Sequence, residues 1–182
     1  EDTADDEAEA IFQTNSMGVL RVCCAVLPIM REQGTGRIVV VSSIAGRVAV
    51  PFQGLYSATK FAVEGLCEAL RMEVKRFGIH VTLVEPGDFH TGFTDRRLRV
   101  RASRENGAYS EACRRALEIA ESDERRASTP EGVARLVSRI LSRRAPRLRY
   151  TVGPALQRVA VRLKSVLPSQ VFEWALGLYY RA

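Results

Sequence analysis

Hydrophobic positions switch between helical and strand-like spacing several times along the chain. Spaced apolar residues predict a long first helix over about 4–33 and another over about 55–77. The run of β-branched residues at 37–41 shows no polar alternation, which is typical of a strand covered on both faces of a parallel sheet, and 79–84 predicts a second buried strand. This succession of helices and strands predicts an α/β fold.

The second half of the chain predicts shorter elements. Thr129 is followed by a proline and an acid, a pattern typical of a helix start. Alternating apolar residues at 148–152 predict a last short strand. Two helical pieces separated by a proline then form an extension over 154–182 of a domain that covers 1–153.

Residues 92–123 are polar, rich in arginine and only partly helical in pattern. Loops of this composition cover binding sites more often than they form cores. We therefore expect this segment to act as a lid over a small-molecule substrate.

The net charge of +6 is unevenly distributed, because residues 135–182 hold ten basic residues against one acid, Glu173. A basic surface can face nucleic acid or anionic lipid, but solvated arginines on helix faces are the commoner explanation. The aromatic, amphipathic tail beyond residue 154 could lie on a membrane. We favour packing of this tail over the substrate pocket or on a partner subunit, and we expect no nucleic-acid partner.

The four cysteines show no spacing typical of a zinc or redox site; they are Cys23, Cys24, Cys67 and Cys113. The first three lie in apolar helical settings and predict buried thiols in a reducing compartment. The histidines, His80 and His90, fall in different elements, so no metal site is predicted. We find neither a secretory signal nor an apolar run of about 20 residues, and we expect a cytoplasmic protein.

Tyr56 and Lys60 lie four residues apart in the helix predicted over 55–77, so they project from one face about a turn apart. A cation within about 4–6 Å favours phenolate, so Lys60 should lower the Tyr56 pKa. Such a tyrosine can give a proton to a carbonyl oxygen or take one from a hydroxyl. Ser43 follows the strand at 37–41 and is the obvious second hydroxyl to hold the same oxygen. A half-exposed Tyr–Lys packing pair is the ordinary alternative.

Four motifs in a fixed order give the chain a resemblance, over nearly its whole length, to the short-chain dehydrogenase/reductase family. They are Asn15, the segment 36–46 with Ser43, the pair Tyr56-x-x-x-Lys60 and the loop Pro86-Gly87-x-x-x-Thr91. The resemblance implies the C-terminal part of a Rossmann-like, doubly wound parallel sheet with flanking helices. Residues 61–70 also resemble the branch of the family that handles steroids, retinoids and other lipophilic alcohols.

The resemblance implies an NAD(P)-dependent oxidoreductase that interconverts an alcohol and a ketone or aldehyde by hydride transfer. Tyr56 would protonate the oxygen that Ser43 holds, while Lys60 would lower the Tyr56 pKa and bind the cofactor ribose. Asn15 would distort its helix and hold a water of the proton relay. The implied cofactor contacts are Tyr56, Lys60, Pro86, Gly87, Phe89 and Thr91.

The glycine-rich phosphate turn that opens a dinucleotide-binding unit is not found, since the early glycines, Gly18, Gly34 and Gly36, do not follow a strand. The family pattern would place three strand–helix repeats of about 30 residues each before Asn15. We therefore expect the C-terminal two-thirds of an enzyme, whose preference for NAD or NADP is decided elsewhere. The alternatives are a non-catalytic truncated fragment, a complete protein without the nucleotide half, and a peripheral membrane-binding module.

The helix predicted over 55–77 carries two stripes. One is apolar and the other consists of small residues, Ala58, Ala62, Gly65 and Ala69. Packing on the chain's own sheet could explain either stripe. The family resemblance instead implies that this helix and the helix at 4–33 pair across two-fold axes, giving a homodimer or homotetramer.

Overall fold

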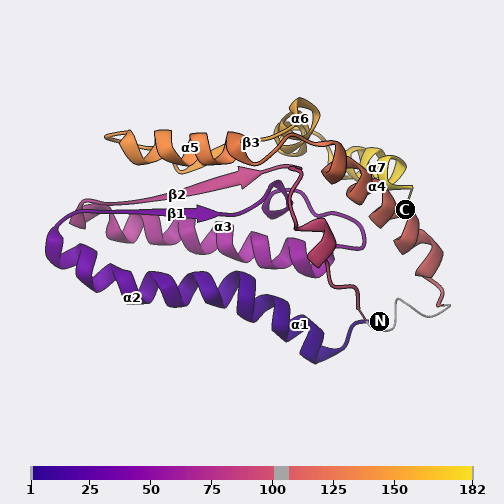
Figure 1. Ribbon diagram of the computed structural model, residues 1–182, viewed down its shortest axis with the longest axis horizontal. Helices are drawn as coiled ribbons and strands as arrows, with labels where there is room; N and C mark the ends of the chain where they lie inside the picture. The colour runs from indigo at the N-terminus through magenta and orange to yellow at the C-terminus, as the bar shows by residue number, and fades with distance from the viewer. Residues whose placement is uncertain (1, 101–106, 182) are drawn as a thin grey trace.

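The computed structural model describes residues 2–100 and 107–181. Three parallel strands, β1 (Gly36–Val41), β2 (Ile79–Pro86) and β3 (Arg149–Val152), form one sheet in the order β1-β2-β3. The helices are α1 (Asp5–Phe12), α2 (Gly18–Gln33), α3 (Gly54–Val74), α4 (Ser110–Arg126), α5 (Glu131–Ser142), α6 (Ala155–Lys164) and α7 (Ser169–Tyr180). Helices α2 and α3 cover one face of the sheet and α5 lies on the other, which confirms the predicted α/β class (Figure 1).

The strand register brings the carboxyl ends of the three strands together. Val41 of β1 pairs with Val84 of β2, and Pro86 pairs with Val152 at the end of β3. The segments that follow these strands therefore meet at one edge, where open parallel sheets hold their ligands. On its outer side β1 pairs with none of the described strands, and Val41 is 53% exposed there.

The main core lies between the sheet and the helices α2 and α3. Its buried members are Cys23, Ile38, Val40, Val63, Cys67, Val74, Ile79, Val81 and Leu83. A smaller cluster of Val84, Ile140 and Tyr150 lies between the sheet and α5. β2 is buried on both faces, and its polar residues Thr82 and Glu85 are buried with the apolar ones.

The predicted first helix contains a π-helical turn, Gln13–Met17, which separates α1 from α2. The helix ends at Gly34, whose positive φ of 66° is a conformation that glycine adopts without strain. Asn15 lies in the π-helical turn, so the distortion expected at this residue is confirmed. Such turns are rare and occur frequently at functional sites.

The continuous helical stretch Asp5–Gln33 is long and apolar enough, by length and composition alone, to cross a membrane. The prediction that no such run exists was therefore wrong. Mostly buried core helices of soluble proteins meet the same criterion, whereas 11% of this apolar window is buried. In this structure Cys23 is buried in the main core, and Val26 and Leu27 pack against it.

The two stripes predicted for α3 face different environments. Val63 and Val74 of the apolar stripe are buried in the main core. The small-residue stripe, Ala58, Ala62, Gly65 and Ala69, is exposed. The apolar stripe therefore accounts for packing on the sheet, and the small residues stay available for another surface.

The predicted burial is confirmed for Cys23 and Cys67, which are buried and free. Cys24 is exposed, so its predicted burial is wrong. It follows Cys23 by one residue, and neighbouring positions in a helix point about 100° apart. Within residues 2–100 and 107–181, no group of three or more His, Cys, Asp and Glu side chains is placed to hold a metal ion.

Candidate active site

Tyr56 and Lys60 lie in the first two turns of α3, beside the carboxyl end of β1. The Lys60 ammonium lies 5.7 Å from the centre of the Tyr56 ring. It also donates a hydrogen bond of 3.3 Å to the carbonyl oxygen of Val41, the last residue of β1. The helical spacing therefore brings the two side chains together as predicted, and the strand end fixes the ammonium.

Ser43 follows β1 in extended conformation and precedes the 3-10 turn Ile44–Gly46. Its hydroxyl accepts a hydrogen bond of 3.1 Å from the backbone N–H of Ala45. The same hydroxyl donates to the Pro86 carbonyl oxygen at 3.5 Å, and its nearness to the Tyr56 phenol acts to lower the Tyr56 pKa. The structure thus brings together the two hydroxyls that the sequence proposed for one oxygen.

The expected lowering of the Tyr56 pKa by Lys60 is not found in this geometry. Burial raises the pKa of Tyr56 above its usual value, and the nearby Ser43 hydroxyl offsets only part of that rise. Lys60 is itself desolvated, which lowers its own pKa, while the Glu64 carboxylate acts in the opposite direction. Removal of the phenolate from water therefore outweighs the nearby ammonium, and Tyr56 is a protonated acid at neutral pH.

Asn15 contacts α3 between Tyr56 and Lys60. Its side-chain amide donates a hydrogen bond of 3.1 Å to the hydroxyl of Thr59, which in turn donates to the Tyr56 carbonyl oxygen at 2.7 Å. Ser16, the next residue of the π-helical turn, donates to the Thr59 carbonyl oxygen at 3.1 Å. The turn thus clamps the part of α3 that carries the tyrosine and lysine.

Thr59 is a residue that sequence reasoning missed. It is fully buried and joins the π-helical turn to α3. Its place inside the motif Tyr56-x-x-x-Lys60 was the one available signal, because residues three apart in a helix are neighbours and a hydroxyl there can bond the turn that carries Tyr56.

The loop after β2 is held by α6. The N–H of Gly87 donates to the Val152 carbonyl oxygen at 2.8 Å. The Gln157 side-chain oxygen accepts from the Asp88 N–H at 2.9 Å, and the Gln157 amide donates to the Asp88 carboxylate. A Cβ on Gly87 would lie 2.2 Å from that Gln157 oxygen, so a larger residue there would displace the Gln157 side chain from Asp88.

Asp88 is a carboxyl group that sequence reasoning did not single out. Burial raises its pKa from 3.8 to about 6, although the Gln157 hydrogen bond acts to lower it. Its negative charge also contributes to the raised pKa of Tyr56. The protonation of this loop is therefore coupled electrostatically to the tyrosine.

The predicted cofactor residues of this loop lie in different surroundings. Thr91 is exposed, and its hydroxyl accepts a hydrogen bond of 3.2 Å from the N–H of Phe93. The ring of Phe89 lies near Gly132 of α5, whereas the exposed His90 is held by its N–H, which donates to the Ser128 carbonyl oxygen at 2.9 Å. Of the predicted cofactor residues Phe89 and Thr91, Thr91 presents an exposed hydroxyl that suits a ligand.

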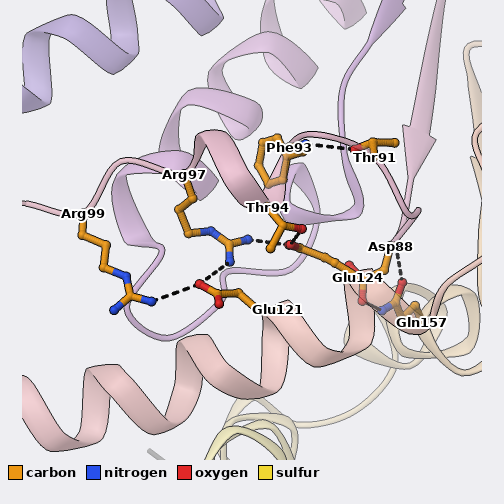
Figure 2. Close-up of polar contacts among 9 residues, drawn as sticks. All are labelled: Asp88, Thr91, Phe93, Thr94, Arg97, Arg99, Glu121, Glu124 and Gln157. Carbon is orange, nitrogen blue, oxygen red and sulfur yellow. Dashed lines mark hydrogen bonds and ion pairs between the residues drawn. The ribbon is translucent and has the colours of Figure 1, made fainter.

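A network of charges fixes the segment after this loop to α4 (Figure 2). The Thr94 hydroxyl donates to the Glu124 carboxylate at 2.5 Å, and Arg97 also binds Glu124. Glu121 forms ion pairs with Arg97 at 3.6 Å and with Arg99 at 3.0 Å. Helix α4 lies within the segment predicted as a lid and extends three residues beyond it.

The segment held by this charge network places the Phe93 ring beside Tyr56. The centre of the Phe93 ring lies 5.7 Å from that of Tyr56, and the Arg97 guanidinium lies 5.5 Å from the Phe93 ring. Sequence reasoning missed Phe93 and Glu124, because their contacts join segments that are distant in sequence. The arrangement places an apolar wall beside a phenol that can exchange a proton.

Comparisons with known proteins give the class to which this fold and site belong. Residues 1–101 match the family described as short chain dehydrogenase. The chain therefore belongs to the short-chain dehydrogenase family, as the motifs indicated. The matched region contains all eight residues that the motifs proposed for catalysis and cofactor binding.

Individual relatives agree with this assignment. The chain is 42% identical over 176 residues to the 3-ketodihydrosphingosine reductase of Bacteroides thetaiotaomicron, covering 97% of this chain and 65% of that protein. A short-chain dehydrogenase structure from Streptomyces avermitilis superposes with a TM-score of 0.74 and 34% identity, covering 96% of this chain and 63% of that one. A Burkholderia phymatum family member in complex with NAD superposes with a TM-score of 0.72 and 29% identity. The match covers 90% of this chain and 59% of that one. The chain thus spans less than two thirds of these relatives.

Proposed function

We propose that the chain carries the catalytic residues of an NAD(P)-dependent oxidoreductase that interconverts an alcohol and a ketone or aldehyde. This function rests on one observation: the Ser43 and Tyr56 hydroxyls converge at the carboxyl edge of β1, with Lys60 one turn further along α3. Membership of an oxidoreductase family supports the same class of reaction.

In the reductive direction Tyr56 gives its proton to the carbonyl oxygen, which the Ser43 hydroxyl holds by donating a hydrogen bond. A bound nicotinamide would supply the hydride in this direction and accept it in the other. In the oxidative direction Tyr56 takes the proton of the alcohol. The Lys60 ammonium, held by the Val41 carbonyl oxygen, stabilises the phenolate that forms in reduction.

The groups at this edge suit a nicotinamide dinucleotide. Lys60 presents an ammonium for ribose hydroxyls, and the exposed Thr91 hydroxyl lies on the loop that begins with Pro86 and Gly87. The NAD complex of the Burkholderia phymatum relative supports a cofactor of this class, either NAD or NADP. Asn15, whose amide is fixed by Thr59, would support the proton relay through a water.

A lipophilic substrate fits the site best. Phe93 supplies an apolar wall beside Tyr56, and the Bacteroides thetaiotaomicron relative is named 3-ketodihydrosphingosine reductase. Comparing kcat/KM over a series of ketones of increasing chain length would test this preference. Values that rise with chain length support it, and values that fall or stay constant would contradict it.

Replacing Tyr56 with phenylalanine in the complete enzyme tests the catalytic assignment. Loss of one acid–base group should lower kcat by about 10²–10⁴-fold while leaving thermal unfolding unchanged. Tyr109, which is 48% exposed, provides a matched control as Tyr109→Phe. Retention of most of the activity by Tyr56→Phe would remove Tyr56 from this role.

A second candidate is that these 182 residues alone bind no dinucleotide and act only as part of a larger catalytic unit. The free edge of β1, where Val41 is 53% exposed, favours this interpretation because exposed strand edges normally pair or are covered. Titration of the isolated chain with NADH and with NADPH separates the two candidates. Stoichiometric binding would exclude the second one.

The exposed small-residue stripe of α3 supports assembly as a homodimer or homotetramer through α1, α2 and α3. Val22 and Ile29 of α2 add apolar surface, at 63% and 57% exposure. A larger charged side chain in the stripe, as in Ala62→Arg, should convert the oligomer to monomers in light scattering. An unchanged molar mass would place the interface elsewhere.

A further inference from the structure

The described part of the chain contains a concave surface that the proposed reaction does not use. It is a groove of about 490 Å³ between α5, β3 and α6. Six arginines line it: Arg135, Arg139, Arg147, Arg149, Arg158 and Arg162. Neither an acidic residue nor any residue proposed for catalysis is among its lining residues.

The arginines come from two helices and one strand region. Arg135 and Arg139 lie one turn apart on α5, and Arg158 and Arg162 lie one turn apart on α6. Both helices lie on the same side of the sheet (Figure 1). Two rows of guanidinium groups therefore border one groove.

Among the described residues, five of the six arginines form no ion pair, although the Thr129 hydrogen bond and, together with it, Arg135 act to lower the pKa of Glu131. Arg149 is the exception, and it pairs with Glu64 at 2.8 Å, with Glu85 at 3.5 Å and with Glu68. The Arg147 guanidinium lies 4.9 Å from the Tyr150 ring instead. Like charges in a concave surface raise the local potential, so an anion in the groove is strongly favoured.

Phosphate is the anionic group that suits this lining. A guanidinium presents paired N–H donors that match phosphate oxygens in bidentate geometry. Arginine pairs on two helices that border one groove can both reach a phosphate group bound in it. The groove is therefore a candidate phosphate site.

The exposed side of α6 indicates where that phosphate comes from. Leu156, Val159 and Leu163 are 68%, 46% and 42% exposed and follow each other at spacings that place them on one helix face. Val166, which is 75% exposed, extends the row just beyond the helix. We call these four residues the α6 apolar row. Arg158 and Arg162 flank it, as cationic residues do on helices that lie in a membrane interface.

We propose that this face docks on an anionic phospholipid surface, with lipid phosphates in the arginine groove and the α6 apolar row in the acyl boundary. A free phosphate would use the arginines but leave the apolar row in water. The docking is independent of the reaction proposed for Tyr56, because the two sites share none of the residues assigned to them.

Co-sedimentation of the purified chain with vesicles tests the proposal. Binding should be stronger to phosphatidylcholine mixed with phosphatidylglycerol than to phosphatidylcholine alone. The double variant Arg158→Gln with Arg162→Gln should bind the anionic vesicles about 10–30-fold more weakly, since each juxtamembrane cation adds a comparable increment of attraction. Arg125→Gln with Arg126→Gln, on the exposed end of α4, removes the same charge elsewhere and should change binding little.

A matched pair of substitutions tests the role of the α6 apolar row. Leu156→Gln and Met72→Gln remove side chains of 68% and 69% exposure, the first from the row and the second from α3. Leu156→Gln should weaken vesicle binding, whereas Met72→Gln should not. Calorimetric binding of inorganic phosphate should be unaffected by both substitutions.

Several outcomes would overturn the proposal. Equal binding to neutral and anionic vesicles would remove the role of the arginines, and equal losses in the two arginine pairs would show a diffuse charge effect. Phosphate binding with no effect of Leu156→Gln on vesicle binding would identify a free-phosphate site. Binding of a duplex DNA that is tighter than vesicle binding and lost in the Arg158/Arg162 variant would identify a nucleic-acid site.

Discussion

The β1–α3 corner and the segment after β2 both place side chains at Tyr56, but they do so by different means. In the corner, a strand end and helical spacing position Ser43, Tyr56 and Lys60. After β2, a network of charges centred on Glu124 holds Phe93 against the tyrosine. Backbone structure therefore fixes the reacting groups, while side-chain pairs fix the wall beside them.

This difference predicts that substitutions in the two regions act on different quantities. Loss of a reacting hydroxyl should lower the rate of the chemical step without changing the fold. Loss of a network charge should release the segment after β2, which lowers stability together with substrate affinity. The following experiments, in order of decreasing expected effect, can separate the two regions.

Ser43→Ala should lower kcat of the complete enzyme by about 10²-fold, because it removes a donor to the oxygen that changes charge. The adjacent Ser42 provides the control, since its hydroxyl is buried without a hydrogen-bond partner. Ser42→Ala should therefore leave kcat nearly unchanged in steady-state assays. Equal losses in the two variants would show that the corner acts through packing.

The raised pKa of Tyr56 predicts opposite pH profiles for the two directions of reaction. Alcohol oxidation needs the phenolate and should rise by about tenfold per pH unit below the Tyr56 pKa. Carbonyl reduction needs the phenol and should fall only when the pH exceeds that pKa. Measurements of kcat/KM in both directions would check this, and an oxidation rate that is already constant at neutral pH would contradict the raised pKa.

Glu124→Gln should release the Arg97 and Thr94 contacts and destabilise the segment after β2. A carboxylate that is 8% exposed and bonded to both residues should contribute about 1–3 kcal/mol to the free energy of unfolding. We expect KM to rise by about tenfold with a smaller change in kcat. Glu118→Gln, on the same helix but paired with Arg114 in solvent, is the control. A loss in kcat alone, with KM and stability unchanged, would contradict the distinction between the β1–α3 corner and the segment after β2.

Asp88→Asn should stabilise the folded chain at neutral pH but not at acidic pH. The folded-state pKa of about 6 lies above the usual 3.8, so the folded state binds the proton more tightly and loses stability as the pH rises from 3.8 through 6. Above that range Asp88→Asn should gain on the order of 1 kcal/mol after allowance for solvent screening. Denaturant titrations at pH 3.5 and at pH 7 would measure this difference; an equal effect at both would contradict it.

The two regions also differ in how far the sequence predicts them. The strands, α3 and the Tyr56–Lys60 pair follow from local apolar patterns and from motif spacing, which act over a few residues. The bond between Thr94 and Glu124 spans 30 residues, and that between Asp88 and Gln157 spans 69. No local pattern specifies which distant charge a side chain will meet.

The error in the Tyr56 pKa has the same origin. The spacing of Tyr56 and Lys60 correctly predicts a neighbouring cation, but it contains no information on burial. In the structure, burial is the largest influence on both groups, and it raises the pKa of Tyr56 while it lowers that of Lys60. The exposure of Cys24 likewise depends on the direction in which α2 faces the sheet.

A double-mutant cycle between Ser43 and Tyr56 tests the central claim most directly, which is that both hydroxyls act on one oxygen. Single-turnover rates of reduction would be compared for the wild type, Ser43→Ala, Tyr56→Phe and the double variant. Substitutions of residues that act as a unit have strongly non-additive effects on the rate, so the double variant should be little slower than Tyr56→Phe alone. A double variant whose loss equals the product of the two single losses would contradict a shared oxygen.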